Sequence, residues 1–124
     1  MSTPVAVTAF TTRSHDAPDE RRTPPKTQVD IVRLEGFTLG RFTFQPGWRW
    51  SECVKPIVGG ESCQVHHVGY AISGRLHARM DTGEELECGP GDAVQIPPGH
   101  DAWVVGDEPY VGVDFTGGDT YAKA

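Results

Sequence analysis

The chain has little of what suits a membrane, a nucleic acid or a disulfide framework. No apolar run approaches the roughly 20 residues that a membrane-spanning helix needs. Lysine and arginine number 11 against 17 aspartates and glutamates, and the net charge of −6 disfavours nucleic acids and anionic membrane surfaces as partners. The 3 cysteines cannot all pair within one chain, so they suit a reducing compartment. The N-terminus lacks the basic start and continuous apolar core of a signal peptide. We therefore expect a cytoplasmic protein that binds neither nucleic acid nor membrane.

A length of 124 residues allows one compact domain. Residues 1–27 are rich in Thr, Pro and charge, a composition that buries too little apolar surface to offset its ordering entropy. We predict a flexible N-terminal arm over 1–27, a folded barrel over 28–118 and a loose tail over 119–124.

Hydrophobic residues follow a period of two from Val29 onward, and no helical period is visible. The 15 glycines and 10 prolines gather in turn signals every eight to twelve residues. This pattern predicts an antiparallel sandwich or barrel. The expected strands cover residues 29–34, 37–44, 48–54, 63–73, 75–80, 84–87, 93–96, 102–105 and 110–115.

The most informative segment is G-D-A-V-Q-I-P-P-G-H, residues 91–100. Gly91 and Asp92 predict a turn before a short strand. Two prolines with fixed φ and then Gly99, which tolerates any φ, predict a second turn directly before His100. A turn held this rigidly can place a polar side chain with little conformational freedom.

These glycines and prolines resemble the second motif of the cupins, which reads Gly, five residues, Pro-x-Gly, two residues, His. Gly91, Pro97 and Gly99 fit this motif. The position of the motif histidine holds Ala102, and a histidine stands two residues earlier as His100.

The first cupin motif reads His-x-His, three or four residues, Glu, six residues, Gly. With Gly74 as the final glycine, His67 stands at the glutamate position, and Glu61 and Cys63 stand at the two histidine positions. The chain thus resembles the family in its backbone pattern, with an altered set of ligands.

The chain is also similar to a subgroup of small single-domain cupins that carry I-P-P-G-H-D-A-W-V-V-G-D-E-P, here residues 96–109. A second shared segment, S-C-x-x-x-H-x-G-Y-x-x-S-G-R, covers residues 62–75. The resemblance extends over about residues 37–115 and implies an all-β, antiparallel jelly-roll β-barrel.

A metal site is the chemistry that these residues favour. Strand alternation places Glu61, Cys63 and His67 on one face, with the small Gly69 and Ala71 leaving room beside them. Cys63, His67 and His100, with Glu61 or a water as fourth partner, form a coherent ligand set for a divalent transition metal. Thiolate and imidazole favour zinc or iron, with nickel or copper also accepted.

A structural role for the same residues stays open. Cys63 would then be a small core residue, His67 would be hydrogen-bonded inside the barrel, and His100 would cap a surface turn. The other histidines, His15, His66 and His77, are expected in the arm or on the surface.

The candidate ligand pocket follows from the same face and from the aromatic side chains. Tryptophans can form flat apolar walls, and a lysine can bind a carboxylate. The predicted pocket residues are Trp50, Lys55, Gly69, Ala71, Ala102 and Trp103.

Three functions fit such a barrel. The first is a metal-dependent enzyme acting on a small organic molecule, such as an oxygenase or isomerase. The second is a non-catalytic module that senses a small ligand or metal. The third, a metal-free isomerase or epimerase, needs a His–Asp pair with an opposing tyrosine, and no such set is evident in the sequence. Edge strands and the N-terminal arm also predict a homodimer.

Overall fold

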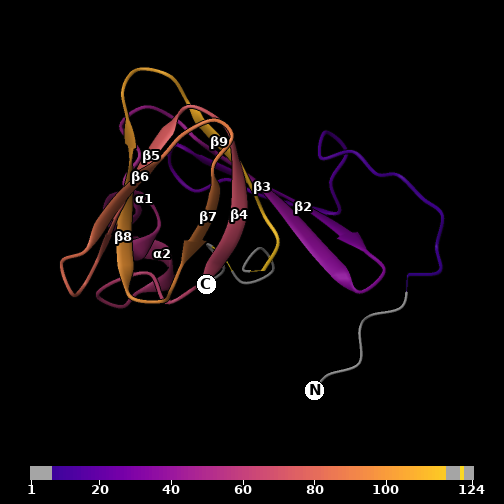
Figure 1. The fold of residues 1–124 in the computed structure, drawn as a ribbon, viewed down its shortest axis with the longest axis horizontal. Coiled ribbons are helices and arrows are strands. Elements are labelled where there is room, and N and C mark those ends of the chain that lie inside the picture. The colour runs from indigo at the N-terminus through magenta and orange to yellow at the C-terminus, as the bar shows by residue number, and fades with distance from the viewer. Residues whose placement is uncertain (1–6, 117–120, 122–124) are drawn as a thin grey trace.

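Two antiparallel sheets face each other in the computed structural model, which describes residues 7–116 and 121 (Figure 1). The six-stranded sheet runs in the order β1 (Glu20–Arg22), β2 (Thr27–Leu34), β3 (Phe37–Phe44), β9 (Tyr110–Asp114), β4 (His67–Ser73) and β7 (Ala93–Ile96). The three-stranded sheet runs in the order β6 (Glu85–Cys88), β5 (Arg75–Met80) and β8 (His100–Val105). The predicted all-β, antiparallel jelly-roll architecture is confirmed.

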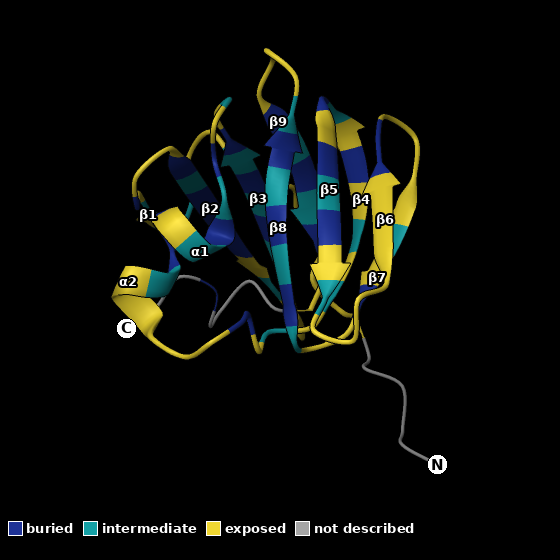
Figure 2. Ribbon diagram, turned by 90° about the vertical axis from the view of Figure 1, so that its left-hand side faces the viewer, coloured by how far each residue is buried: buried dark blue, intermediate teal, exposed yellow. Residues whose placement is uncertain are grey.

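The core lies between the two sheets, because alternate residues of each strand point inward (Figure 2). On β3, Phe42 and Phe44 are buried and Thr43 between them is only partly buried. On β9, Tyr110 is buried and its neighbour Val111 is only partly buried. The fully buried Trp48 stacks on Phe44 with ring centroids 3.8 Å apart. Its indole Nε1 donates a hydrogen bond to Thr27 Oγ1 at 2.8 Å. The sheet nearest the viewer in Figure 2 is the three-stranded one.

The predicted strand over 48–54 is wrong. The chain instead forms two short helices, α1 (Trp50–Cys53) and α2 (Lys55–Val58). The buried residues Trp50, Cys53 and Val54 are spaced three and four apart, which is a helical spacing that the alternation of this short segment concealed. Asp101 of β8 supports the start of α1, since its carboxylate accepts hydrogen bonds from the backbone N–H and hydroxyl of Ser51.

The long strand predicted over 63–73 is only partly present. β4 begins at His67, and Cys63 forms a single antiparallel bridge with His100. The backbone N–H of Cys63 donates to the carbonyl of His100, and the N–H of Gly99 donates to the carbonyl of Cys63, both at 2.7 Å. The predicted turn, strand and turn over 91–100 are confirmed, because β7 ends at Ile96 and β8 begins at His100. The interrupted strand therefore still brings Cys63 against the proline turn.

Part of the segment predicted as an arm forms β1 on the edge of the six-stranded sheet. Beside it, the fully buried carboxylate of Asp30 lies between Arg21 and Arg41, with N···O distances of 2.7 and 3.0 Å. Arg22 of β1 also donates a hydrogen bond to the carbonyl of Tyr121 at 2.6 Å. Of the predicted tail, only Tyr121 lies within the described residues, and its side chain is buried.

Within residues 7–116 and at 121, no helix is long and apolar enough to cross a membrane.

Candidate metal centre

Cys63, His67 and His100 come together at one end of the barrel. Each offers one ligand atom, and these atoms all lie within 4.8 Å of one another. Sγ of Cys63 lies 4.0 Å from Nε2 of His67. The bridge between Cys63 and His100 fixes two of the three residues, and the first residue of β4 supplies the third. The structure thus brings together three of the four predicted metal ligands.

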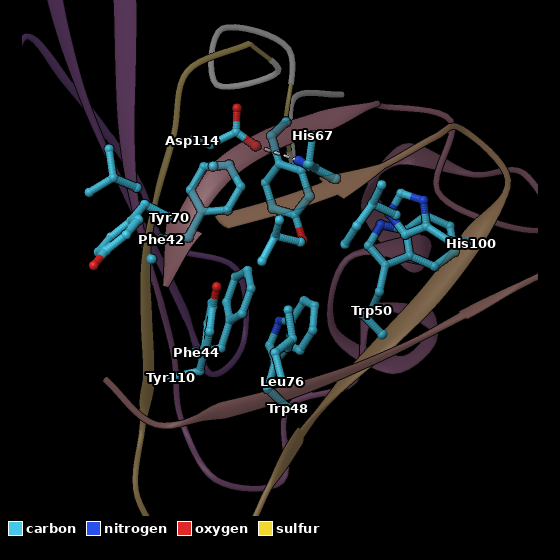
Figure 3. A pocket seen from close by; sticks show the side chains of 17 residues that line it. Phe42, Phe44, Trp48, Trp50, His67, Tyr70, Leu76, His100, Tyr110 and Asp114 are labelled. Carbon is cyan, nitrogen blue, oxygen red and sulfur yellow. Dashed lines mark hydrogen bonds and ion pairs between the residues drawn. The ribbon is translucent and has the colours of Figure 1, made fainter. Parts of the chain in front are cut away.

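His67 is oriented by a carboxylate. Its Nδ1 lies 2.6 Å from Oδ2 of Asp114, which is the last residue of β9 and is buried. A carboxylate only accepts hydrogen bonds when ionised, so Nδ1 carries the hydrogen and Nε2 presents its lone pair towards Cys63. The dashed line in Figure 3 marks this pair. A carboxylate behind a metal-ligating histidine is a common outer-shell arrangement in metal sites.

His100 is oriented in the same way by the backbone. Its Nδ1 lies 2.7 Å from the carbonyl oxygen of Pro97, in the turn directly before it. Because a carbonyl can only accept, Nδ1 again carries the hydrogen and Nε2 keeps its lone pair. Burial lowers the pKa of His100, which favours the neutral imidazole that a metal requires. Both histidines therefore offer Nε2 to the cluster.

Cys63 is a buried thiol in the free protein. Burial raises its pKa to about 11, against a smaller lowering by a backbone hydrogen bond of Val65. Binding a metal would therefore release a proton from Sγ, because the thiolate is the ligand.

The donor set fits a transition metal ion. Bond lengths of about 2.0 Å to nitrogen and 2.3 Å to sulfur place ligand atoms about 3.3–3.6 Å apart in a tetrahedral site. The separation of 4.0 Å between Sγ and Nε2 of His67 is slightly wider than this range, so small side-chain rotations would close the site. Two imidazoles and one thiolate suit zinc or iron(II) better than magnesium or calcium.

A cavity of ≈60 Å³ adjoins the cluster on the histidine side. Figure 3 shows Trp50 beside His100, with Phe42, Phe44, Tyr110 and Trp48 to the left of them. Apart from His67, His100 and Asp114, apolar and aromatic residues form most of its wall: Phe42, Phe44, Trp48, Trp50, Leu76, Val94, Ile96 and Ala102 among them. The histidine side of the cluster therefore faces a mostly apolar wall.

The predicted pocket residues divide into two groups. Trp50, Gly69 and Ala102 line the cavity. Ala71 is fully buried but does not reach the cavity wall. Trp103 points to the outer face of the three-stranded sheet, where its ring stacks on His77 at 4.7 Å and under the Arg49 guanidinium. The role assigned to Trp103 is therefore not supported by its position.

Two further predicted residues, Glu61 and Lys55, lie away from the cluster. Glu61 lies in the loop that follows α2, and its carboxylate is fully exposed. It lies 3.9 Å from Nζ of Lys55, the first residue of α2. Glu61 does not join Cys63, His67 and His100, because the chain is not in strand conformation before His67 and alternation does not apply there. A fourth ligand from the chain is thus absent among the described residues.

Sequence reasoning missed two residues at the site, Asp114 and Tyr121. Alternation over 110–115 places Asp114 on the same inward face as Tyr110 and Gly112. A carboxylate on an inward face of a predicted strand is the sequence signal that could have identified Asp114 as a site residue. Tyr121 follows no pattern, yet its ring stacks on Phe42 at 4.6 Å and meets His67 edge-on at 5.5 Å. A His–Asp pair with an opposing tyrosine is not evident in the sequence, but the structure pairs His67 with Asp114 and places the Tyr121 ring beside His67.

A scan of known protein families finds no match to the chain, and no curated protein matches its sequence. Solved structures do match. A protein of unknown function from Rhizobium leguminosarum bv. viciae 3841 has a TM-score of 0.63 at 22% identity, over 88% of this chain and 97% of that one. KdgF from Halomonas sp. has a TM-score of 0.60 at 21% identity, over 89% of this chain and 94% of that one.

Oxalate decarboxylase from Lactobacillus farciminis, solved as a formate complex, has a TM-score of 0.58 at 16% identity over 82% of this chain. Our chain spans 32% of that protein's length. At these identities the likeness concerns the fold alone. The chain has the antiparallel jelly-roll barrel fold of the cupins.

Proposed function

We propose that this protein binds one divalent transition metal ion through Sγ of Cys63 and Nε2 of His67 and His100, and that the ion receives a small organic ligand from the cavity. The observation that carries the proposal is the shared orientation of the histidines. An acceptor behind each Nδ1, Asp114 for His67 and the Pro97 carbonyl for His100, leaves both Nε2 atoms free to bind a metal in a cluster that includes a cysteine.

Zinc or iron(II) is the ion that this donor set favours, with nickel or copper as alternatives. Three protein ligands with an open position are typical of a metal site that binds a ligand or takes part in catalysis, rather than of a closed structural site. When bound, the ion supplies Lewis acidity at the open position. The chain contributes the orientation of His67 through Asp114 and an apolar wall that limits water near the cluster.

The ligand is best described as small, with one coordinating group and an apolar or planar body. The cavity offers mostly aromatic and aliphatic contacts, and its volume of ≈60 Å³ is modest. One similar structure, an oxalate decarboxylase, was solved with formate. Small carboxylates are accordingly the first ligands to test.

Metal analysis of protein purified without chelator tests the proposal, with about one equivalent of zinc or iron expected per chain. Cobalt(II) substitution adds a direct readout of the thiolate ligand, because a cobalt–thiolate bond absorbs in the near ultraviolet. Cys63→Ser should remove this absorption. Cys88→Ser is the matched control, since Cys88 is also buried and free but lies on β6 beside Tyr110. Equal cobalt spectra in the two variants would contradict the site.

A second candidate follows from the pair that sequence reasoning missed. His67 with Asp114 behind it can take up a proton at Nε2, and the carboxylate stabilises the imidazolium that forms. With Tyr121 at the same site, this set suits a metal-free isomerase of a small carbonyl compound. The discriminating measurement is exchange of α-hydrogens of small keto acids and keto sugars in D₂O with the protein in excess chelator. Exchange that disappears in Asp114→Asn would favour this candidate over the metal site.

A binding module without turnover remains the alternative to an enzyme. Oxygen uptake and product formation across small acids and phenols distinguish the two, because a sensor binds without turnover. The expected homodimer and cytoplasmic location stay predictions. Light scattering tests the first, and a single monomer mass would contradict it.

A further inference from the structure

A second cavity lies on the other side of the cluster. It measures ≈350 Å³ and is lined by Cys63, by Val54 and Val58 of the helical segment, and by the loop residues Gly59, Gly60, Ser62, Gln64 and Val65. The first cavity, of ≈60 Å³, contains His67 and His100 in its wall but not Cys63. The thiol and the two imidazoles of one cluster therefore face different spaces.

Two aromatic residues, Trp50 and Tyr121, line both cavities. Trp50 is the first residue of α1 and is 2% exposed. Tyr121 is 3% exposed and, unlike Trp50, comes from outside the sheets and helices. Their rings form the partition between the space at the histidines and the larger space at the cysteine.

Tyr121 is held in this partition from two sides. Its ring stacks on Phe42 with centroids 4.6 Å apart and 26° between the planes. Its backbone carbonyl accepts a hydrogen bond from Arg22 Nη1 at 2.6 Å. The Arg22 side chain is 9% exposed and also pairs with Glu20 at 2.6 Å, so the donor is itself fixed on β1. These contacts fix the position of Tyr121 against β1 and β3, which are far from it in the sequence.

We propose that Tyr121 is a specificity-determining residue, whose ring separates the two cavities and limits the size of ligand that can bind at the histidine side of the cluster. The space of ≈60 Å³ on the histidine side is much smaller than the space of ≈350 Å³ on the cysteine side, so the Tyr121 ring withholds the larger space from a ligand at the histidines. Larger ligands are excluded, because the space that they need lies beyond the Tyr121 ring. The consequence for metal ligands rests on the proposed function, whereas the separation of the cavities does not.

Imidazole and 4-phenylimidazole test the size limit on the cobalt(II) protein by absorption titration. Both have the same coordinating ring, and the second carries an additional phenyl ring that needs more space beside the histidines. The native protein should bind imidazole and discriminate against 4-phenylimidazole. In Tyr121→Ala the ratio of the two dissociation constants should fall by about tenfold or more, which is the scale at which a pocket discriminates by shape.

Tyr121→Phe keeps the ring and should keep the native ratio, whereas Tyr121→Leu should give an intermediate ratio if Tyr121→Ala does not fold. Phe37→Ala is the control for loss of an aromatic ring, since Phe37 is exposed and lines neither cavity. A ratio in Tyr121→Ala and Tyr121→Leu equal to the native one would overturn the proposal.

Binding of p-cresol to the metal-free protein tests the partition by itself. The molecule contains the phenol group that Tyr121→Ala removes, and an apolar cavity made by truncation binds molecules of about the removed shape. Calorimetry should detect p-cresol binding to metal-free Tyr121→Ala and not to the native protein or Tyr121→Phe. If neither the native protein nor any variant binds cobalt, the proposed metal site fails. Binding of p-cresol to the metal-free protein then still decides whether Tyr121 separates the two cavities. The absence of p-cresol binding to Tyr121→Ala would then overturn the partition.

Discussion

Nδ1 of His67 lies 2.6 Å from Oδ2 of Asp114, and this pair joins the neighbouring strands β4 and β9 of the six-stranded sheet. The pair determines which nitrogen of His67 faces Cys63. It also serves both proposed chemistries, because the carboxylate would orient a metal-ligating imidazole in one and stabilise an imidazolium in the other.

Asp114→Asn should weaken metal binding by about 10–100-fold, the usual effect of losing an outer-shell partner of a ligating histidine. An amide can either donate to or accept from Nδ1, so it no longer fixes the tautomer that presents the Nε2 lone pair. Competition with a chromophoric chelator measures the change. Asp107→Asn, in an exposed turn, is the control and should leave the affinity unchanged. Native affinity in Asp114→Asn would show that Asp114 does not orient the ligand.

Metal affinity should rise with pH. Burial raises the pKa of the Cys63 thiol to about 11, so below that pH the free protein holds a proton on Sγ that binding must release. One released proton raises the apparent association constant about tenfold per pH unit between pH 7 and 9. Chelator competition across this range measures the slope. Cys63→Ser should bind more weakly with a smaller slope, and a native slope of zero would show that Cys63 is not a thiolate ligand.

The sequence predicted the barrel well because alternation and turn residues act locally. Gly91 to His100 formed the expected turn, strand and turn, with Gly99 at a φ of 92°. Alternation failed where the chain leaves the sheet, so Trp50 was assigned to a strand and Glu61 to the metal ligands. Asp114 and Tyr121 could not be linked to His67 from the sequence, because strand order and the return of residue 121 to the barrel are set by tertiary packing.

Gly69→Ala should destabilise the fold and weaken metal binding together. A Cβ at Gly69 would lie 2.4 Å from the carbonyl oxygen of Val113, so β4 and β9 would have to separate. Overpacking of this kind costs about 1–3 kcal/mol. Gly69 lies opposite Asp114 in the sheet register, so the same separation would disturb the His67 pair.

Denaturant unfolding and chelator competition measure the two effects of Gly69→Ala. Ser73→Ala, a small change on the same strand, is the control and should affect neither quantity strongly. Reduced stability with native metal affinity would show that β9 can move without disturbing His67.

Asp30→Asn should reduce stability at neutral pH, and the difference should shrink in acid. Burial raises the pKa of Asp30, but hydrogen bonds from Arg21, Gln28 and Arg41 outweigh it and hold the pKa below its usual value. A carboxylate with a lowered pKa stabilises the folded state fully above its unfolded pKa of about 3.9, and this contribution is lost as the pH falls from that value through the lower pKa of the folded state. Since Arg21 and Arg41 are partly exposed, we expect a loss of about 2 kcal/mol at pH 7, within the range for hydrogen bonds to charged groups. Urea unfolding of native protein and Asp30→Asn at pH 7 and pH 3.5 measures the difference. A difference that stays constant between the two pH values would contradict the lowered pKa, because the native carboxylate would then contribute nothing through its charge.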